Sequence, residues 1–197
     1  MKKLIFYCFL CISLGTYAQQ KYEREYRIPA SEVPQKALDF IESFDVTKKV
    51  KWYQEQGLNN TSVEAKFKLL GSKYSIEFSD DGELQDIERK IPLKELPESI
   101  KQAIALDLKE RYDAYAIEKI QVQYTGEPEF LLMWRGFHNF PEYSMATAVV
   151  GIEYGYEIII RTRTKNKVQL FEFQFDKTGQ KITQKEIITR DTDILKF

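Results

Sequence analysis

The sequence has few of the residues that most often carry covalent or metal chemistry. Its two cysteines, Cys8 and Cys11, both lie within the first 18 residues, so the rest of the chain can form no disulfide. It has one histidine, His138. A zinc site would have to combine this histidine with carboxylates alone, which is an uncommon ligand set. The sequence therefore predicts no metal site and no other cofactor.

The start of the chain has the pattern of a secretory signal peptide. Lys2 and Lys3 precede an apolar run over residues 4–14, and Ala18 ends a short segment of the kind that is cleaved. The run is shorter than the roughly 20 residues that cross a bilayer. Neither Cys8 nor Cys11 follows the small residue of a lipoprotein cleavage box. We therefore expect residues 1–18 to be removed, and a periplasmic or secreted protein without lipid anchor or membrane insertion.

The charge pattern indicates neither a nucleic-acid partner nor an anionic membrane as partner. Without Lys2 and Lys3, 27 basic and 30 acidic side chains remain, and the two signs are interleaved along the chain. Binding to a phosphate backbone or to an anionic membrane needs a cluster of basic residues. The sequence predicts neither partner.

No catalytic motif is recognisable. The glycines open no helix in the pattern of a phosphate-binding loop, and Ser144 near His138 belongs to no nucleophile elbow. Asp80 and Asp81 precede Gly82, which is typical of a turn. We therefore expect no catalytic residues and a protein that is not an enzyme.

A seven-residue pattern occurs twice, at residues 28–34 and 91–97, and each copy precedes an amphipathic helix. Both copies carry a glutamate before the second proline, which places negative charge at the start of the helix. The apolar faces have helical spacing. They comprise Val33, Ala37, Phe40, Ile41 and Phe44 in the first helix, and Ile100, Ala103, Ile104, Leu108 and Tyr112 in the second.

Strand patterns follow each helix. Alternation of apolar and polar residues, with glycine turns between the runs, predicts four strands in each half. The first four lie near residues 50–54, 63–69, 74–78 and 84–90, and the second four near 117–124, 156–164, 168–175 and 181–188. We expect an α+β fold of two tandem units, residues 19–90 and 91–197, each a helix packed on an antiparallel meander sheet of about four strands.

One segment, residues 126–155, has no counterpart in the first unit. It contains Trp134, Phe137, Phe140 and Tyr143 around Arg135, and aromatic and Arg side chains dominate binding hot spots. The same rings would equally serve to cover the core of the second unit. Both interpretations stay open.

The polar face of the strands is the second candidate surface. Tyr53, Arg161 and Arg163 lie on it, and alternating charge on a strand usually marks a solvated face. Only a concave sheet shared by both units would turn this face into a groove.

These features resemble the PepSY-like, beta-lactamase-inhibitor-like family of exported Bacteroidota proteins. The resemblance rests on the Glu-(Val/Leu)-Pro helix openings, on Val50-Lys51-Trp52 before residues 63–67, and on residues 78–84. It covers most of residues 28–125 and 155–190, and it implies helix-on-sheet units with a curved sheet. Inhibition of a beta-lactamase would be an analogy of fold alone.

Two functions follow as expectations. The first is an exported, non-catalytic binding module, an inhibitor among the options, which presents a sheet face or the aromatic segment to a protein or peptide. The alternative is a periplasmic protein that binds a small ligand or takes part in the response to envelope stress. The sequence leaves the partner and the oligomeric state open.

Overall fold

The computed structural model describes residues 19–21, 24–44, 46, 49–57, 60–134, 151–165 and 167–188. Its helices are α1 (Gln35–Ser43), α2 (Glu98–Lys109) and α3 (Pro128–Trp134). Its strands are β1 (Gln19–Lys21), β2 (Arg24–Ile28), β3 (Lys51–Gln56), β4 (Thr61–Leu69), β5 (Ser72–Ser79), β6 (Leu84–Lys90), β7 (Ala114–Gly126), β8 (Ile152–Thr164), β9 (Lys167–Asp176) and β10 (Lys181–Ile187). Both predicted helices and all eight predicted strands are present, together with β1, β2 and α3.

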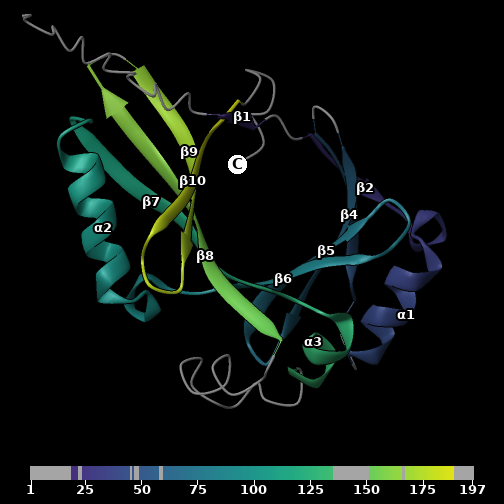
Figure 1. Ribbon diagram of the computed structural model, residues 1–197. Helices are drawn as coiled ribbons and strands as arrows, with labels where there is room; N and C mark the ends of the chain where they lie inside the picture. Colours follow the sequence, from purple (N-terminus) through teal and green to yellow (C-terminus); the bar gives the residue numbers. More distant parts are fainter. Residues whose placement is uncertain are drawn as a thin grey trace, which may run out of the picture.

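All ten strands belong to one sheet, in the order β1-β10-β9-β8-β7-β6-β5-β4-β3-β2 (Figure 1). Strands β2 to β10 pair antiparallel, and only β1 is parallel to its neighbour. The prediction of two units, each a helix on its own four-stranded sheet, is wrong. Its error lies at β6 and β7, where residues 87–90 pair with residues 121–124. In two separate sheets, β6 and β7 would each be an edge strand with unpaired backbone N–H and C=O groups. In the single sheet these groups of β6 and β7 form hydrogen bonds with each other.

The two helices begin in the same way. A 3₁₀ turn over Ala30–Glu32 precedes α1, and one over Leu93–Glu95 precedes α2. Pro34 and Pro97 are the residues directly before each α-helix, and their carbonyls accept the first helical hydrogen bonds. The repeated seven-residue pattern is therefore a turn that starts a helix.

Both helices pack on the same face of the sheet, which is its outer face (Figure 1). The Phe40 ring of α1 lies 5.7 Å from the Phe78 ring, and Tyr112, just after α2, lies 5.9 Å from Phe171. A row of register partners crosses the middle of this core, and all of them are buried: Ala65, Ile76, Ile87 and Tyr124. One apolar layer therefore runs under both helices.

The same turn closes the last hairpin of each half. Gly82 and Gly179 both have a positive φ, and their N–H groups donate to the carbonyls of Ser79 and Asp176. A Cβ at Gly82 would lie 2.8 Å from the Cβ of Pro34, so this turn packs directly on the start of α1. Gly179 lies in the corresponding place beside the start of α2, where a Cβ would lie 3.5 Å from Ile100 Cγ1.

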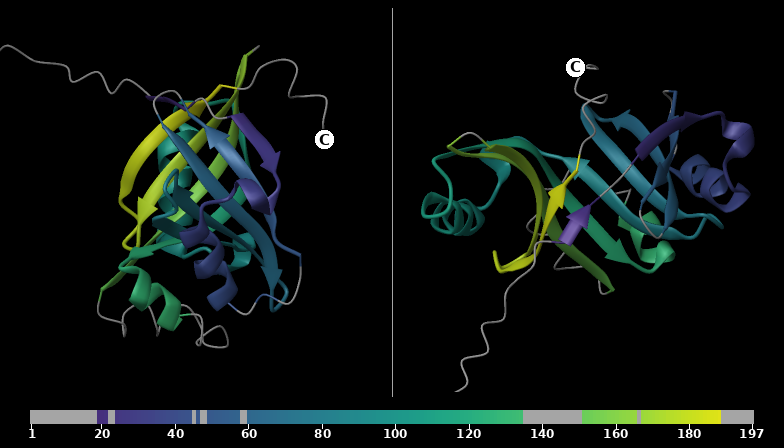
Figure 2. Two further views of the ribbon diagram at one scale, coloured as in Figure 1. Left: turned by 90° about the vertical axis from the view of Figure 1, so that its right-hand side faces the viewer. Right: turned by 90° about the horizontal axis from the view of Figure 1, so that it is seen from above.

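The sheet curves so strongly that its two edges come together. Strands β1 and β2 form opposite ends of the strand order, yet only residues 22 and 23 separate them in the chain. Three peptide links hold the Cα atoms of Lys21 and Arg24 within about 11 Å. The result is a deep trough with the helices outside, seen along two further directions in Figure 2.

The segment without a counterpart is the connection between β7 and β8. The β7–β8 ladder extends to the pair Gly126 and Ile152, so the connection is shorter than residues 126–155. It begins with α3, in which Leu131 is fully buried. Within the described part of the chain, no helix is both long and apolar enough to cross a bilayer.

Candidate functional site

The inner face of the trough is polar and yet largely buried. Alternate residues of each strand point to it, and register aligns them in rows. One such row places Tyr53 beside Glu64, Glu64 beside Glu77, and Glu77 beside Asp86. The sequence pattern predicted a solvated face here. Glu64 is instead only 4% exposed, because the curvature of the sheet encloses its own inner face.

Six carboxyl groups cross this face on five strands, and we call them the carboxyl belt. They are Glu64 on β4, Glu77 on β5, Asp86 and Glu88 on β6, Glu157 on β8 and Glu172 on β9. All are buried except Glu77, which is partly buried. So many carboxyls away from water must be neutralised by cations or by protons.

Three members of the belt have lysine partners. Lys66 Nζ lies 2.7 Å from Glu64 Oε2, and Lys119 Nζ lies 3.5 Å from Glu157 Oε1. Glu172 forms an ion pair with Lys21, and Lys185 Nζ is 3.7 Å away from its other oxygen. Lys21 belongs to β1, so the strand that closes the trough also neutralises a carboxylate within it.

Asp86 and Glu88 are bound by amides of β7 instead. Gln121 Nε2 donates to Glu88 Oε2 at 2.5 Å, and Gln123 Nε2 donates to Asp86 Oδ2 at 2.9 Å. Among the described residues, neither these two carboxyls nor Glu77 has a lysine or arginine within ion-pair distance. These three carboxyls lack a direct ion pair with any described residue, although the charges of Lys21 and Lys119 still favour their ionised forms.

The acidity of these groups reflects their burial. Burial, followed by the charge of Asp86, raises the pKa of Glu77 to about 8, and burial raises the pKa of Asp86 to about 7. Burial also raises the pKa of Glu88 well above its ordinary value, with the charge of Glu157 adding to the effect. In the absence of a bound cation, protons therefore remain on this part of the belt near neutral pH.

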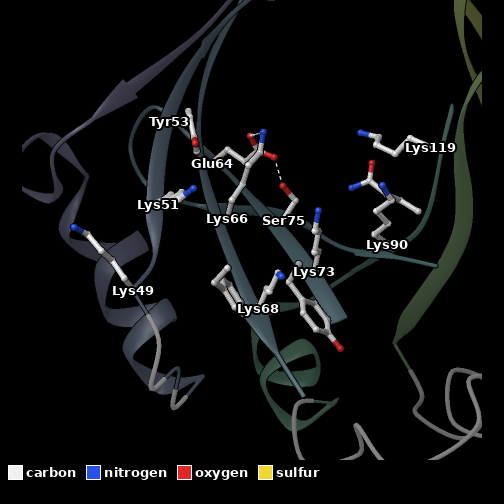
Figure 3. A pocket seen from close by; sticks show the side chains of 13 residues that line it. Lys49, Lys51, Tyr53, Glu64, Lys66, Lys68, Lys73, Ser75, Lys90 and Lys119 are labelled. Atoms are coloured by element: carbon white, nitrogen blue, oxygen red, sulfur yellow. Dashed lines mark hydrogen bonds and ion pairs between the residues drawn. The ribbon is translucent and has the colours of Figure 1, made fainter. Parts of the chain in front are cut away.

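A cavity of about 700 Å³ lies at one end of the belt (Figure 3). Its lining combines seven lysines with three aromatic residues, Glu64 and two neutral polar residues, and we call it the lysine cavity. The lysines are Lys49, Lys51, Lys66, Lys68, Lys73, Lys90 and Lys119, and the aromatic residues are Tyr53, Phe67 and Tyr74. Its volume is within the range of small-molecule sites.

Most of these lysines form no ion pair with a residue that the structure describes. Lys66 binds Glu25 and Glu64, and Lys119 binds Glu157. Burial lowers the pKa of Lys66, but the charges of Glu64 and Glu25 outweigh this effect and raise it. Within the described part of the chain, the other five lysines of the cavity form no ion pair. Five like charges around one cavity create a strongly positive potential.

The predicted site residues are distributed unevenly over this arrangement. Tyr53 lines the lysine cavity, where the ring contacts Lys66 Nζ at 4.9 Å from its centre. Arg161 and Arg163 are exposed on β8 and do not line the cavity, and Arg161 Nε is 3.0 Å from Glu118. Trp134 ends α3, but its side chain is outside what the structure describes, as are Arg135, Phe137, Phe140, Tyr143 and His138.

Sequence reasoning missed the carboxyl belt. Its members are spread over residues 64–172, and each one alone resembles an ordinary polar residue of a strand. Only the β6–β7 pairing and the curvature bring them onto one enclosed face. The signal in the sequence was the repeated glutamate within apolar strands, at positions 64, 77, 88, 157 and 172.

No family model, curated protein or solved structure matches this chain. The resemblance to PepSY-like proteins therefore stays a prediction.

Proposed function

We propose that the protein is an exported, non-catalytic binding module that holds an anionic ligand in the lysine cavity. One observation carries this proposal: five exposed lysines that form no ion pair with any described residue line a cavity of about 700 Å³. Keeping unpaired like charges close together is unfavourable unless a ligand compensates for them. An anion that enters the cavity gains the attraction of all five.

One aromatic ring refines the ligand class. Tyr53 offers apolar surface beside the ammonium groups, whereas the Phe67 and Tyr74 rings stack on each other in the buried core, where Phe67 also contacts Phe44. A small molecule or short peptide with at least two carboxylate or phosphate groups and an apolar part would use both features. Because lysines are flexible point charges, this site selects for charge more than for a particular geometry.

The test is a titration of the chain from residue 19 onward with citrate, inorganic pyrophosphate and a tetraglutamate peptide, followed by calorimetry. We expect saturable binding of at least one probe, weakened as salt screens the lysines. The combined substitution of Lys68, Lys73 and Lys90 by Gln should remove it. Substitution of Lys94, Lys109 and Lys177, exposed lysines outside the cavity, should not. Equal binding by both triple variants, or no binding at millimolar probe, would overturn the proposal.

Protein recognition through the sheet is the second candidate. Arg163 pairs in register with Val168, which is 62% exposed, and Arg161 lies next to them along β8. An exposed patch of arginine and aliphatic side chains suits a protein surface better than a small anion. If a partner from the envelope bound through this patch, Arg161→Ala with Arg163→Ala would weaken the complex while leaving probe binding in the lysine cavity unchanged.

A further inference from the structure

Three glutamates of the carboxyl belt bring their oxygens into one small volume. Glu64, Glu77 and Glu88 each place a carboxylate oxygen within 4.8 Å of the other two. We call them the glutamate triad. They come from three adjacent strands, because Glu64 pairs with Glu77 across β4 and β5, and Glu88 lies on β6.

Distances of this size suit a hard cation. Calcium binds oxygen ligands at about 2.3–2.6 Å, so two oxygens on the same ion are at most about 5 Å apart. The triad meets this limit without any movement of the backbone. Its ligands are all carboxylates, which favours Ca²⁺, Mg²⁺ or Mn²⁺ over metals that prefer nitrogen or sulfur.

A further oxygen beside the triad points to a missing ligand. Gln121 Oε1 has no hydrogen-bond partner among the described residues, and its residue is only 6% exposed. The side-chain N–H of Gln121 donates to Glu88, which keeps the amide next to the triad. Asp86 Oδ1 is also buried without a described partner, but Asp86 has no carboxylate oxygen within 4.8 Å of all three triad members. An unpaired buried oxygen is costly, and a cation bound by the triad would satisfy that of Gln121.

The nearby lysine does not fill this role. Lys66 Nζ lies 2.7 Å from Glu64 Oε2 and 2.8 Å from Glu25 Oε2, so the two glutamates share it. Among the described residues, no lysine or arginine forms an ion pair with Glu77 or Glu88. The triad therefore keeps at least two carboxylates available to a cation while Lys66 stays with Glu25.

We propose that the glutamate triad binds one divalent cation, with Ca²⁺ preferred over Mg²⁺, and that Gln121 Oε1 contributes to its oxygen shell. Preference for Ca²⁺ follows from the number of oxygens and from the spread of the triad over three strands. Mg²⁺ demands a tight octahedron at about 2.0–2.1 Å and releases its water reluctantly. This proposal does not depend on the anionic ligand of the lysine cavity.

Equilibrium dialysis of the metal-free chain from residue 19 onward with radioactive Ca²⁺ at pH 7.5 provides the test. We expect one ion per chain, displaced by Mg²⁺ only at a large excess, and a rise in melting temperature with added Ca²⁺. Glu77→Gln and Glu88→Gln should each weaken binding by at least about tenfold, the loss that even an outer-shell change can cause.

Glu157→Gln is the matched control, because Glu157 is a buried member of the belt outside the triad. It should retain binding. Where a triad variant does not fold, the stoichiometry and the Ca²⁺-to-Mg²⁺ preference of the unsubstituted chain decide the question. Absence of bound Ca²⁺ at millimolar concentration, or the same affinity in Glu77→Gln as in Glu157→Gln, would overturn the proposal.

Discussion

The side-chain amide of Gln121 donates a 2.5 Å hydrogen bond to the carboxyl group of Glu88 across the ladder that joins the two halves of the sheet. Glu88 lies on β6, the last strand of the first half, and Gln121 on β7, the first strand of the second. Both side chains are buried. This contact therefore belongs both to the junction of the fold and to the polar inner face.

Replacing Gln121 by Met tests what this contact contributes. Met has a similar shape but no amide, so the buried carboxyl group of Glu88 loses its donor. We expect a loss of about 1–3 kcal/mol in the free energy of unfolding, measured by urea denaturation. Gln102→Met, on the exposed side of α2, makes the same chemical change outside the belt and should have little effect. Equal effects of the two substitutions would contradict a role for the Glu88 contact.

The helices and most of the strands could be predicted from the sequence, but the way in which the strands assemble into one sheet could not. The spacing of Phe40 and Ile41 predicts the buried face of α1, and the alternation around Phe67 predicts β4, because both patterns are local. Pairing of residues 87–90 with 121–124 has no such signal, since it depends on which edges remain free after each half has formed. Strand β2 was missed because it is almost wholly exposed and has no apolar alternation.

The inner face shows the same limit. A glutamate such as Glu64, between Val63 and Ala65, indicates the solvent-exposed face of a strand. This prediction would hold for a flat sheet. Its burial comes from curvature, to which the short link between β1 and β2 contributes. Whether a polar face is exposed to solvent or enclosed depends on the shape of the whole sheet. It therefore cannot be predicted from a short stretch of the sequence.

Gly71 and Gly82 offer a comparison that separates backbone strain from packing. Both have a φ near +85°, at +87° and +85°. A Cβ at Gly71 would meet nothing within 4 Å, whereas one at Gly82 would lie 2.8 Å from the Cβ of Pro34. We expect Gly71→Ala to cost about 1 kcal/mol of stability from backbone strain. Gly82→Ala should cost roughly 1–3 kcal/mol more, because it overpacks the turn against the start of α1.

Urea denaturation of both alanine variants measures this difference. Far-ultraviolet circular dichroism provides the check that each variant keeps its strands. If the two substitutions destabilised the protein equally, the Gly82 turn would not be packed on the helix as described.

Lys21 connects closure of the trough with the charge inside it. Its ammonium group forms an ion pair with Glu172, whose side chain is 2% exposed. Removal of one partner from a buried pair leaves an uncompensated charge. We expect Lys21→Met to reduce stability by roughly 2–3 kcal/mol, less than for an isolated pair because Lys185 lies 3.7 Å from the other oxygen of Glu172.

A double-substitution cycle separates the pair from general effects of the change. Glu172→Gln combined with Lys21→Met should recover part of the loss, since no buried charge then remains unpaired. Lys36→Met provides the exposed comparison, because Lys36 and Glu83 form an ion pair with both side chains largely in solvent. It should have no measurable effect on the urea midpoint. A strictly additive cycle for Lys21 and Glu172 would argue against their interaction.

The raised pKa values of the carboxyl belt predict an unusual pH dependence for the cation-free protein. Glu77 has its pKa raised to about 8 and Asp86 to about 7, both above the ordinary range near 4 that the unfolded chain retains. The folded state therefore holds protons that the unfolded state has already released. The contribution of these two groups to stability is greatest below about pH 4, and it is lost as the pH rises through about 7 and 8.

The window from pH 5 to pH 8 isolates this effect. Asp81 and Asp176 have a pKa lowered by hydrogen bonds from Ser79 and Thr178, so their contribution changes only at lower pH. Substitution of His138, the only histidine, by Gln removes the other side chain with an ordinary pKa in the window. In this background, with a chelator present, we expect the free energy of unfolding to fall by on the order of 3 kcal/mol from pH 5 to pH 8.

Glu77→Gln should flatten this slope, because an amide is neutral at every pH and needs no proton to be tolerated in the belt. The measurement is a series of urea curves at half-unit steps of pH for both proteins. Since most proteins are at their most stable between about pH 5 and 8, a steady loss over that range is distinctive. Stability that stayed constant or rose from pH 5 to pH 8 would show that Glu77 and Asp86 are ionised at little cost, and the inner face would then be open to water.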